Sequence, residues 1–187
     1  MPAVSRPVQP LLETQRLTLR AFTMADAPQV QRLAGDRDIA STTLVIPHPY
    51  EDGMAEAWIG TLEAKFAAGR SVILAITLRD CGELIGGTGL AIEPEHNRAE
   101  LGYWIGKPFW NHGYATEAGK AMLHYAFATL QLNRVYAYHY CRNPASGRVL
   151  QKVGMTHEGR LRRHTLKWGV FEDDDFYGIL RSEYAPE

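Results

Sequence analysis

The chain has 187 residues, and 20 Lys and Arg nearly balance 21 Asp and Glu, giving a formal net charge of −1. This length suits one domain with a single sizeable core, and the charge balance does not favour a protein that coats nucleic acid. No apolar run reaches the length of a membrane span, and residues 1–10 lack the apolar centre of a signal peptide. The two cysteines form no CxxC motif, and the seven histidines lack metal-ligand spacing. We therefore expect a cytoplasmic protein without a metal, with residues 1–11 as a flexible tail and residues 12–184 as one domain.

The first third of the chain predicts one strand and two helices. Polar and apolar residues alternate over Arg16–Arg20, which is typical of a strand. Thr23 followed by an acidic residue three positions later predicts a capped helix that ends near residue 34. A loop with two prolines is expected over 36–50. A second helix is expected over 51–68, where apolar residues recur at helical spacing and a glycine follows.

The middle of the chain predicts a meander of three strands followed by a helix. The strands are expected at 71–78, 83–92 and 98–105, with short polar turns between them, so antiparallel pairing should follow. A helix is expected over 113–130.

The last part of the chain predicts a strand over 133–140, a short helix from Pro144 to about residue 154, and strands over 156–161 and 172–180. The whole order predicts an α+β fold with a mostly antiparallel sheet. One helix crosses over between two neighbouring strands, so those two strands must run parallel.

The most informative segment is the turn Trp110–Ala118, which follows the apolar run 101–105 and opens a helical pattern. Helix N-termini carry unpaired N–H groups and a positive dipole end, which can hold a phosphate. Gly113 and the small Ala115 would let a ligand approach the backbone, and Thr116 could donate a hydroxyl. An ordinary strand-to-helix connection explains the same residues, because short glycine turns are weak indicators.

Several segments together resemble the ribosomal-protein N-acetyltransferase branch of the GNAT N-acetyltransferases. The run Trp110–Ala115 is similar to the family's [Q/R]-x-x-G-x-[G/A] loop, which binds the pyrophosphate of acetyl-CoA, although Trp110 replaces the usual Gln or Arg. The other matching segments are Glu13–Arg20, Gly82–Gly86, Ala99–Gly106, Arg142–Ser146, Val149–Met155 and Glu158–Leu161.

The resemblance implies a mixed, mostly antiparallel GNAT sheet of about seven strands, with helices on both faces and a splayed central strand pair. It also implies acetyl-CoA as cosubstrate, with its pantetheine arm lying between the splayed strands. The residues expected to bind this cosubstrate are Tyr103, Trp104, Ile105, His112, Gly113, Tyr114, Ala115, Thr116, Asn143 and Ser146.

Two residues are candidates for the chemistry. Glu100, at the start of the strand that carries the acetyl site in this family, is the expected general base; the alternative is an exposed strand residue paired with Arg98. The usual tyrosine acid of the wider superfamily is replaced by Leu150, so the resemblance assigns Ser146 to the departing thiolate. Ser146 could instead cap its helix. Another glutamate, catalytic in some relatives, is absent near residues 163–165.

These residues predict an N-acetyltransferase that moves an acetyl group from acetyl-CoA to a primary amine, on either a protein N-terminus or a small molecule. The alternative is an acyl-CoA sensor with the same fold but no turnover. Asp174 and Asp175 could attract a cationic acceptor, although an acidic run is usually a solvated turn. No membrane partner and no direct nucleic-acid partner are expected, and homodimer formation stays open.

Overall fold

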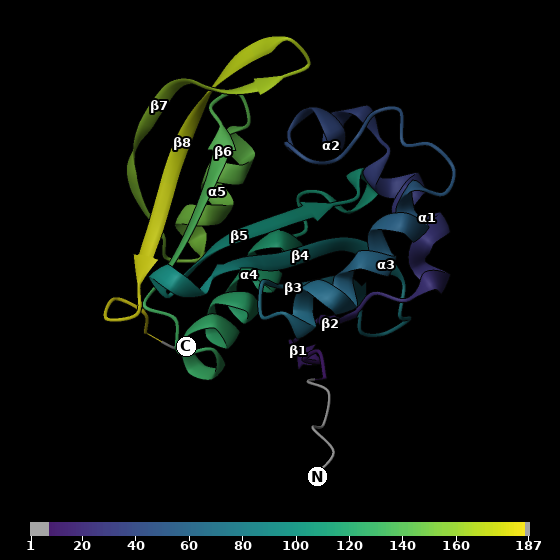
Figure 1. Ribbon diagram of the computed structural model, residues 1–187, viewed down its shortest axis with the longest axis horizontal. Coiled ribbons are helices and arrows are strands. Elements are labelled where there is room, and N and C mark those ends of the chain that lie inside the picture. The colour runs from purple at the N-terminus through teal and green to yellow at the C-terminus, as the bar shows by residue number, and fades with distance from the viewer. Residues whose placement is uncertain (1–7, 186–187) are drawn as a thin grey trace.

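The computed structural model describes residues 8–185, which fold into eight strands and five α-helices (Figure 1). The strands are β1 (Leu12–Glu13), β2 (Leu17–Ala21), β3 (Ser71–Leu78), β4 (Leu84–Glu93), β5 (Arg98–Ile105), β6 (Arg134–Tyr140), β7 (Thr156–Lys167) and β8 (Val170–Leu180). The helices are α1 (Ala27–Ala34), α2 (Arg37–Ser41), α3 (Met54–Ala67), α4 (Tyr114–His124) and α5 (Pro144–Lys152). Most of the expected tail lies outside the described residues, so its flexibility stays a prediction.

All strands belong to one sheet with the order β1-β2-β3-β4-β5-β6-β8-β7. Every neighbouring pair runs antiparallel except β5 and β6, which run parallel because α4 carries the chain back across the sheet between them. The predicted α+β class, the mostly antiparallel sheet and the parallel crossover pair are therefore confirmed.

Helices cover both faces of the sheet and form two apolar cores. One core joins α4 and α5 to the strands and includes Leu101 and Ile105 of β5. The other lies under α1 and α3, and Trp104 packs against it. Because successive side chains of a strand point to opposite faces, Tyr103 shares the α4–α5 face, whereas Glu100 shares the face of Trp104.

The parallel pair β5 and β6 holds together only at its start. Residues 98–100 pair with residues 134–136, and no pairing continues beyond Glu100 and Tyr136. Figure 1 shows the two arrows separating from this common start, with β5 and β6 pointing in different directions. The divergence of β5 and β6, meaning residues 101–105 and 137–140, therefore lies at the centre of the sheet, as the GNAT resemblance implies.

Several predicted elements differ from the structure, and the sheet has eight strands rather than about seven because β1 was not predicted. The expected loop 36–50 contains the one-turn helix α2, which starts because the Asp36 carboxylate accepts the N–H of Asp38 at 2.8 Å. The predicted helix 113–130 is α-helical to residue 124 and continues as a π-turn over residues 125–129. Strand β7 continues to Lys167, beyond its predicted end. A bulge between Leu161 and Thr165 interrupts the alternation of its side chains, so the sequence pattern does not indicate its second half.

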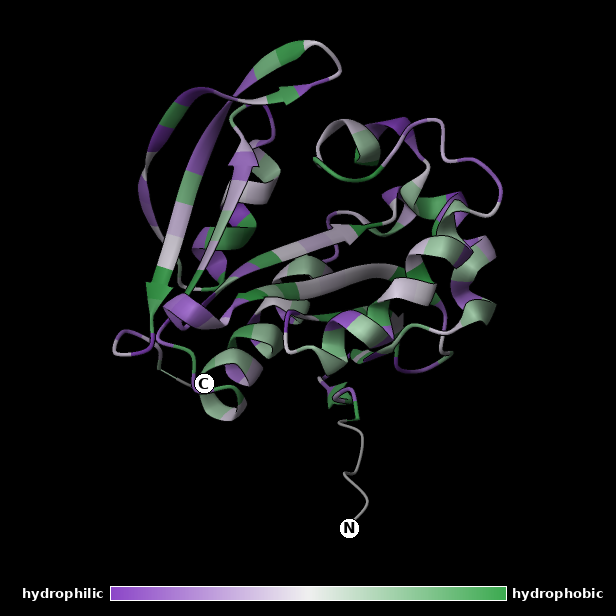
Figure 2. Ribbon diagram, viewed as in Figure 1, coloured by the Kyte–Doolittle hydropathy of each residue, from purple (hydrophilic) through white to green (hydrophobic). Residues whose placement is uncertain are grey.

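The tip of the β7–β8 hairpin reaches back to the segment between α2 and α3. The Lys167 ammonium donates hydrogen bonds to the carbonyl oxygens of Leu44 and Ile46 at 3.2 and 3.3 Å. Figure 2 shows hydrophobic colour at this tip, where Val170 and Phe171 are exposed.

Within residues 8–185, no helix is long and apolar enough to cross a bilayer.

Candidate active site

The turn that leads into α4 has an exposed backbone suited to an anion. Gly113 is the N-cap residue, with φ of +82°, and Asn111 also has a positive φ of +66°. A Cβ added to Gly113 would meet a single nearby atom, the Arg16 Nη2 at 3.5 Å. Because the first N–H groups of a helix have no intrahelical acceptor, the predicted residues 112–116 present donors and a positive dipole end at one surface.

Aromatic and imidazole groups hold this turn in shape. The Trp110 indole N–H donates to the Ile105 carbonyl at 2.6 Å. His112 Nδ1 lies 2.8 Å from the Trp110 carbonyl oxygen, and the His112 ring stacks on Tyr114 with centroids 5.6 Å apart. Trp110 thus ties the turn to the end of β5, which is a physical role for the residue that departs from the usual family pattern.

Arg16, for which the sequence predicted no role, also reaches this turn from the position just before β2. Its guanidinium donates to the His112 carbonyl at 2.9 Å and forms an ion pair with Glu117 at 2.7 Å. Both residues lie in segments that carry the family resemblance, but their contact joins positions about a hundred residues apart. Nothing in the local pattern of either segment predicts it.

The divergence of β5 and β6 leaves one edge of β5 without a strand partner. β5 stays paired with β4 as far as Ile105, so the backbone groups that point the other way, beyond Glu100, face no strand. The Trp104 side chain packs against Phe22 and Gly87 on the α1–α3 side, so Trp104 offers its backbone at this edge. An extended ligand could use such an edge as an added strand does.

Tyr103 of β5 and Ser146 of α5 form a hydrogen bond on the α4–α5 side of this divergence. Their hydroxyl oxygens lie 2.7 Å apart, and the Tyr103 hydroxyl also lies 3.2 Å from the Ser146 carbonyl. Burial raises the pKa of Tyr103 to about 12, so its phenol keeps its proton at neutral pH. Asn143, not Ser146, is the N-cap of α5, because its side chain accepts the Ser146 N–H. The capping alternative for Ser146 is therefore wrong.

Leu150 cannot assist this pair, because it is buried in the core at 1% exposure and carries no proton to donate. The hydroxyls of Tyr103 and Ser146 are thus the proton-bearing groups that the structure brings together at this point. The sequence predicted both residues as cosubstrate contacts but not the hydrogen bond between them.

Glu100 lies on the opposite face, at the last paired position before the strands separate. Its side chain is half-buried, and burial, reinforced by the negative charge of Glu93, raises its pKa. Arg98 does not neutralise it, because Arg98 binds the Glu93 carboxylate through two hydrogen bonds of 3.1 and 2.9 Å. The alternative pairing of Glu100 with Arg98 is therefore wrong. A raised pKa brings a carboxylate closer to the range in which it can accept a proton from an amine.

The acidic run after the β7–β8 turn is mostly bound within the protein, although Asp174 Oδ1 is buried without a hydrogen-bond partner. The Asp175 carboxylate receives two hydrogen bonds of 2.9 Å from Arg160. Asp174 is fully buried and accepts a 2.6 Å hydrogen bond from the Thr165 hydroxyl. Asp175 is therefore already neutralised by a cation, and Asp174 is closed to solvent, so the structure gives no support to a surface that attracts cations here.

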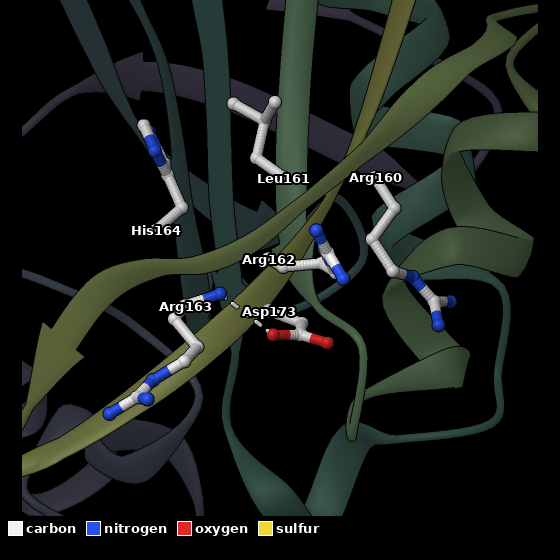
Figure 3. A pocket seen from close by; sticks show the side chains of 6 residues that line it. All are labelled: Arg160, Leu161, Arg162, Arg163, His164 and Asp173. Atoms are coloured by element: carbon white, nitrogen blue, oxygen red, sulfur yellow. Dashed lines mark hydrogen bonds between the residues drawn. The ribbon is translucent and has the colours of Figure 1, made fainter.

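A hollow of about 670 Å³ lies beside this run, at the β7 bulge (Figure 3). Asp173 accepts the Arg163 backbone N–H at 2.8 Å, drawn as the dashed line, while the Arg163 guanidinium points away from it. The hollow is lined by Arg160, Leu161, Arg162, Arg163, His164 and Asp173. Its surface is basic, and none of the predicted site residues lines it.

The comparisons agree with the fold and with the resemblance. Residues 16–156 match the family model described as "Acetyltransferase (GNAT) domain". The "Uncharacterized N-acetyltransferase YoaA" of Bacillus subtilis (strain 168) is 33% identical over 92% of this chain and 97% of its own. The "Ribosomal-protein-serine acetyltransferase" of Escherichia coli (strain K12) is 29% identical over 48% of this chain and 50% of its own. A solved GNAT-family acetyltransferase from Bacillus anthracis has a TM-score of 0.81 at 25% identity, covering 93% of this chain and all of that one.

Proposed function

Because this chain belongs to the GNAT acetyltransferase family, we propose that it transfers an acetyl group from acetyl-CoA to a primary amine. The observation that carries the proposal is one juxtaposition in the structure. The exposed N-terminus of α4, the Tyr103–Ser146 hydroxyl pair and the half-buried Glu100 all border the divergence of β5 and β6.

The cosubstrate would bind along the α4–α5 face. Backbone N–H groups of residues 112–116, together with the Thr116 hydroxyl, would donate hydrogen bonds to the pyrophosphate oxygens. The pantetheine arm would lie along the free edge of β5, using the backbone of Tyr103, Trp104 and Ile105 and the side chain of Asn143. A backbone N–H near Ile105 would stabilise the negative charge that develops on the thioester oxygen.

Two protons must move during the transfer. The amine nitrogen attacks the thioester carbonyl carbon, so a C–N bond forms and the C–S bond breaks. Glu100, directly or through a water molecule, accepts the proton that the amine loses. The departing thiolate receives a proton from Ser146, which the Tyr103 phenol can resupply through their 2.7 Å hydrogen bond. The base and the acid thus approach the reacting carbon from opposite faces of the sheet.

The acceptor is a protein N-terminus or a small-molecule amine. An α-amine has a pKa near 8 and a lysine side chain one near 10.4, so an α-amine requires less help from a base at neutral pH. The E. coli relative, by its name, acetylates a serine of a ribosomal protein, which favours testing peptides with a free N-terminal serine first.

The test is a thiol-release assay with acetyl-CoA and a panel of amines: peptides with free N-termini, the same peptides blocked at the N-terminus, and polyamines. Acetylated product that appears with a free amine and not with its blocked counterpart supports the proposal. Tight binding of acetyl-CoA by calorimetry, combined with no acceleration by any amine, would favour the acyl-CoA sensor instead. The Tyr103–Ser146 pair argues against that alternative, because a sensor requires no proton donor at the sulfur.

A further inference from the structure

Arg16, the residue before β2, contacts three residues at or near the start of α4. Its Nη1 donates to the His112 carbonyl at 2.9 Å, and its Nε donates to Glu117 Oε2 at 2.7 Å. Its guanidinium carbon lies 4.7 Å from the centre of the Tyr114 ring, within range of a cation–π interaction. One side chain from a distant part of the sequence therefore contacts the candidate phosphate site at His112 and Tyr114 and the helix just after it at Glu117.

The contact with His112 sets the direction of a backbone donor. A trans peptide is planar, so the C=O of residue 112 and the N–H of Gly113 point in opposite directions. While Arg16 holds the His112 carbonyl, the Gly113 N–H points away from Arg16. Without Arg16 this peptide could rotate and place a carbonyl oxygen where a phosphate oxygen should lie.

The ion pair with Glu117 offsets the repulsion that the Glu117 carboxylate would exert on a bound phosphate. Glu117 lies in the first turn of α4, where a negative charge competes with a bound anion for the helix dipole. Burial opposes ionisation of Glu117, but hydrogen bonds from the Thr14 hydroxyl and from Arg16 outweigh burial and lower its pKa, so the carboxylate is charged at neutral pH. Arg16 places a permanent positive charge 2.7 Å from that carboxylate.

We propose that Arg16 is a positioning residue for the phosphate groups of the cosubstrate: it orients the His112–Gly113 peptide and cancels the charge of Glu117. This inference rests on the proposed function, because it names how this chain makes the N-terminus of α4 receptive to acetyl-CoA. The arginine acts through the turn and through Glu117, not through the reacting atoms. It should therefore affect cosubstrate affinity and leave the chemical step nearly unchanged.

The test measures binding of acetyl-CoA and of CoA by calorimetry, and kcat and KM for acetyl-CoA with an accepted amine. Arg16→Gln should weaken the Kd at least tenfold and raise KM by a similar factor, while kcat at saturation stays within about twofold. Arg16→Lys, which retains the charge but not the forked geometry, should recover part of the loss. The double variant Arg16→Gln/Glu117→Gln should bind more tightly than Arg16→Gln but more weakly than the wild type, because the unneutralised carboxylate is gone while the His112 carbonyl still lacks its donor.

Arg20→Gln is the matched control. Arg20 lies in β2 and forms a two-bond ion pair with Asp26, so its loss costs a comparable contact away from α4. Its Kd should match that of the wild type, and melting temperatures of all variants report folding separately.

Three results would contradict the inference. An Arg16→Gln variant that is folded and binds acetyl-CoA as tightly as the wild type overturns it, as does a double variant that binds no better than Arg16→Gln. A wild-type protein that binds neither acetyl-CoA nor CoA overturns the proposed function as well, so the two failures are distinguishable.

Discussion

Replacing Ser146 by alanine should slow acetyl transfer much more than it destabilises the fold. The substitution removes the Oγ that lies 2.7 Å from the Tyr103 hydroxyl, but it leaves the backbone of residue 146 in place. The Asn143 cap still accepts the N–H of that residue, and Tyr103 can still donate to its carbonyl at 3.2 Å. Helix α5 therefore keeps its start, and the phenol keeps one partner.

The expected magnitudes differ enough to be separated. Loss of one hydroxyl hydrogen bond costs about 0.5–1.5 kcal/mol of unfolding free energy, and the remaining partner of Tyr103 places Ser146→Ala at the lower end. For a domain of this size that is a fall of about 1–4 °C in melting temperature. Loss of a proton donor to the leaving thiolate should lower kcat about 100-fold, or about 2.7 kcal/mol of activation free energy. KM for acetyl-CoA should change little, because the interaction strengthens only in the transition state.

Steady-state thiol release and thermal melting are measured on the same preparations, with Thr77→Val as the control. The Thr77 hydroxyl donates a 2.9 Å hydrogen bond to the Thr18 carbonyl in the distant β2–β3 pair, so this control loses one buried hydrogen bond away from the site. If Ser146→Ala keeps kcat within threefold, or if its activity falls only in proportion to its folded fraction, the assignment of Ser146 to the leaving group is wrong.

Three further predictions address the other parts of the site and the fold. Gly113→Asp should weaken acetyl-CoA binding at least tenfold in calorimetry, because it adds a negative charge and a side chain at φ of +82°; a folded variant with unchanged Kd would remove residues 112–116 as the phosphate site. Glu100→Gln should lose most activity near neutral pH and little at pH 9–10, about where amines deprotonate unaided. The pH–rate profile of the wild type should fall on the acid side as Glu100 is protonated, at a pH above the ordinary glutamate range because its pKa is raised, and the variant should lack this fall. Wild-type rates across pH 6–9 would refute this role. Arg160→Met should make the fold more sensitive to acid, because the Arg160 guanidinium lowers the pKa of Asp175. The resulting stabilisation is present above the unfolded-state pKa of Asp175 and is lost as pH falls through its folded-state pKa. Denaturant melts over pH 2–6 should show this loss beginning at a higher pH in the variant, and parallel pH curves would contradict the pairing.

Local patterns in the sequence predicted the parts of the protein that depend on neighbouring residues. The strand limits 71–78 and 98–105 match β3 and β5, because alternation and β-branched residues favour an extended backbone wherever a sheet will accept them. The start of α4 also matches closely, because Gly113 provides the positive φ that the turn requires. The phosphate-site prediction is local in the same sense, since it rests on the free N–H groups of one helix end.

The partner of each charged or hydroxyl side chain was decided by the tertiary structure. Arg98 and Glu100 are two positions apart on one strand, so their side chains share a face of the sheet. The Arg98 guanidinium nevertheless binds Glu93, because the β4–β5 turn places Glu93 directly opposite Arg98. Arg160 neutralises Asp175, and Ser146 meets Tyr103, only because β7 lies beside β8 and α5 packs across the divergence of β5 and β6.

Most of these contacts join residues that are far apart in the chain, and all of them depend on how strands and helices are placed, so periodicity carries no information about them. A hydrogen bond requires two atoms within about 3 Å, and that distance is set by strand register and helix packing rather than by the residue types alone. The sequence thus determined the family, most of the elements and the exposed helix end. The tertiary structure alone decided which carboxylate stays without a cation, which hydroxyls meet, and which arginine reaches the turn.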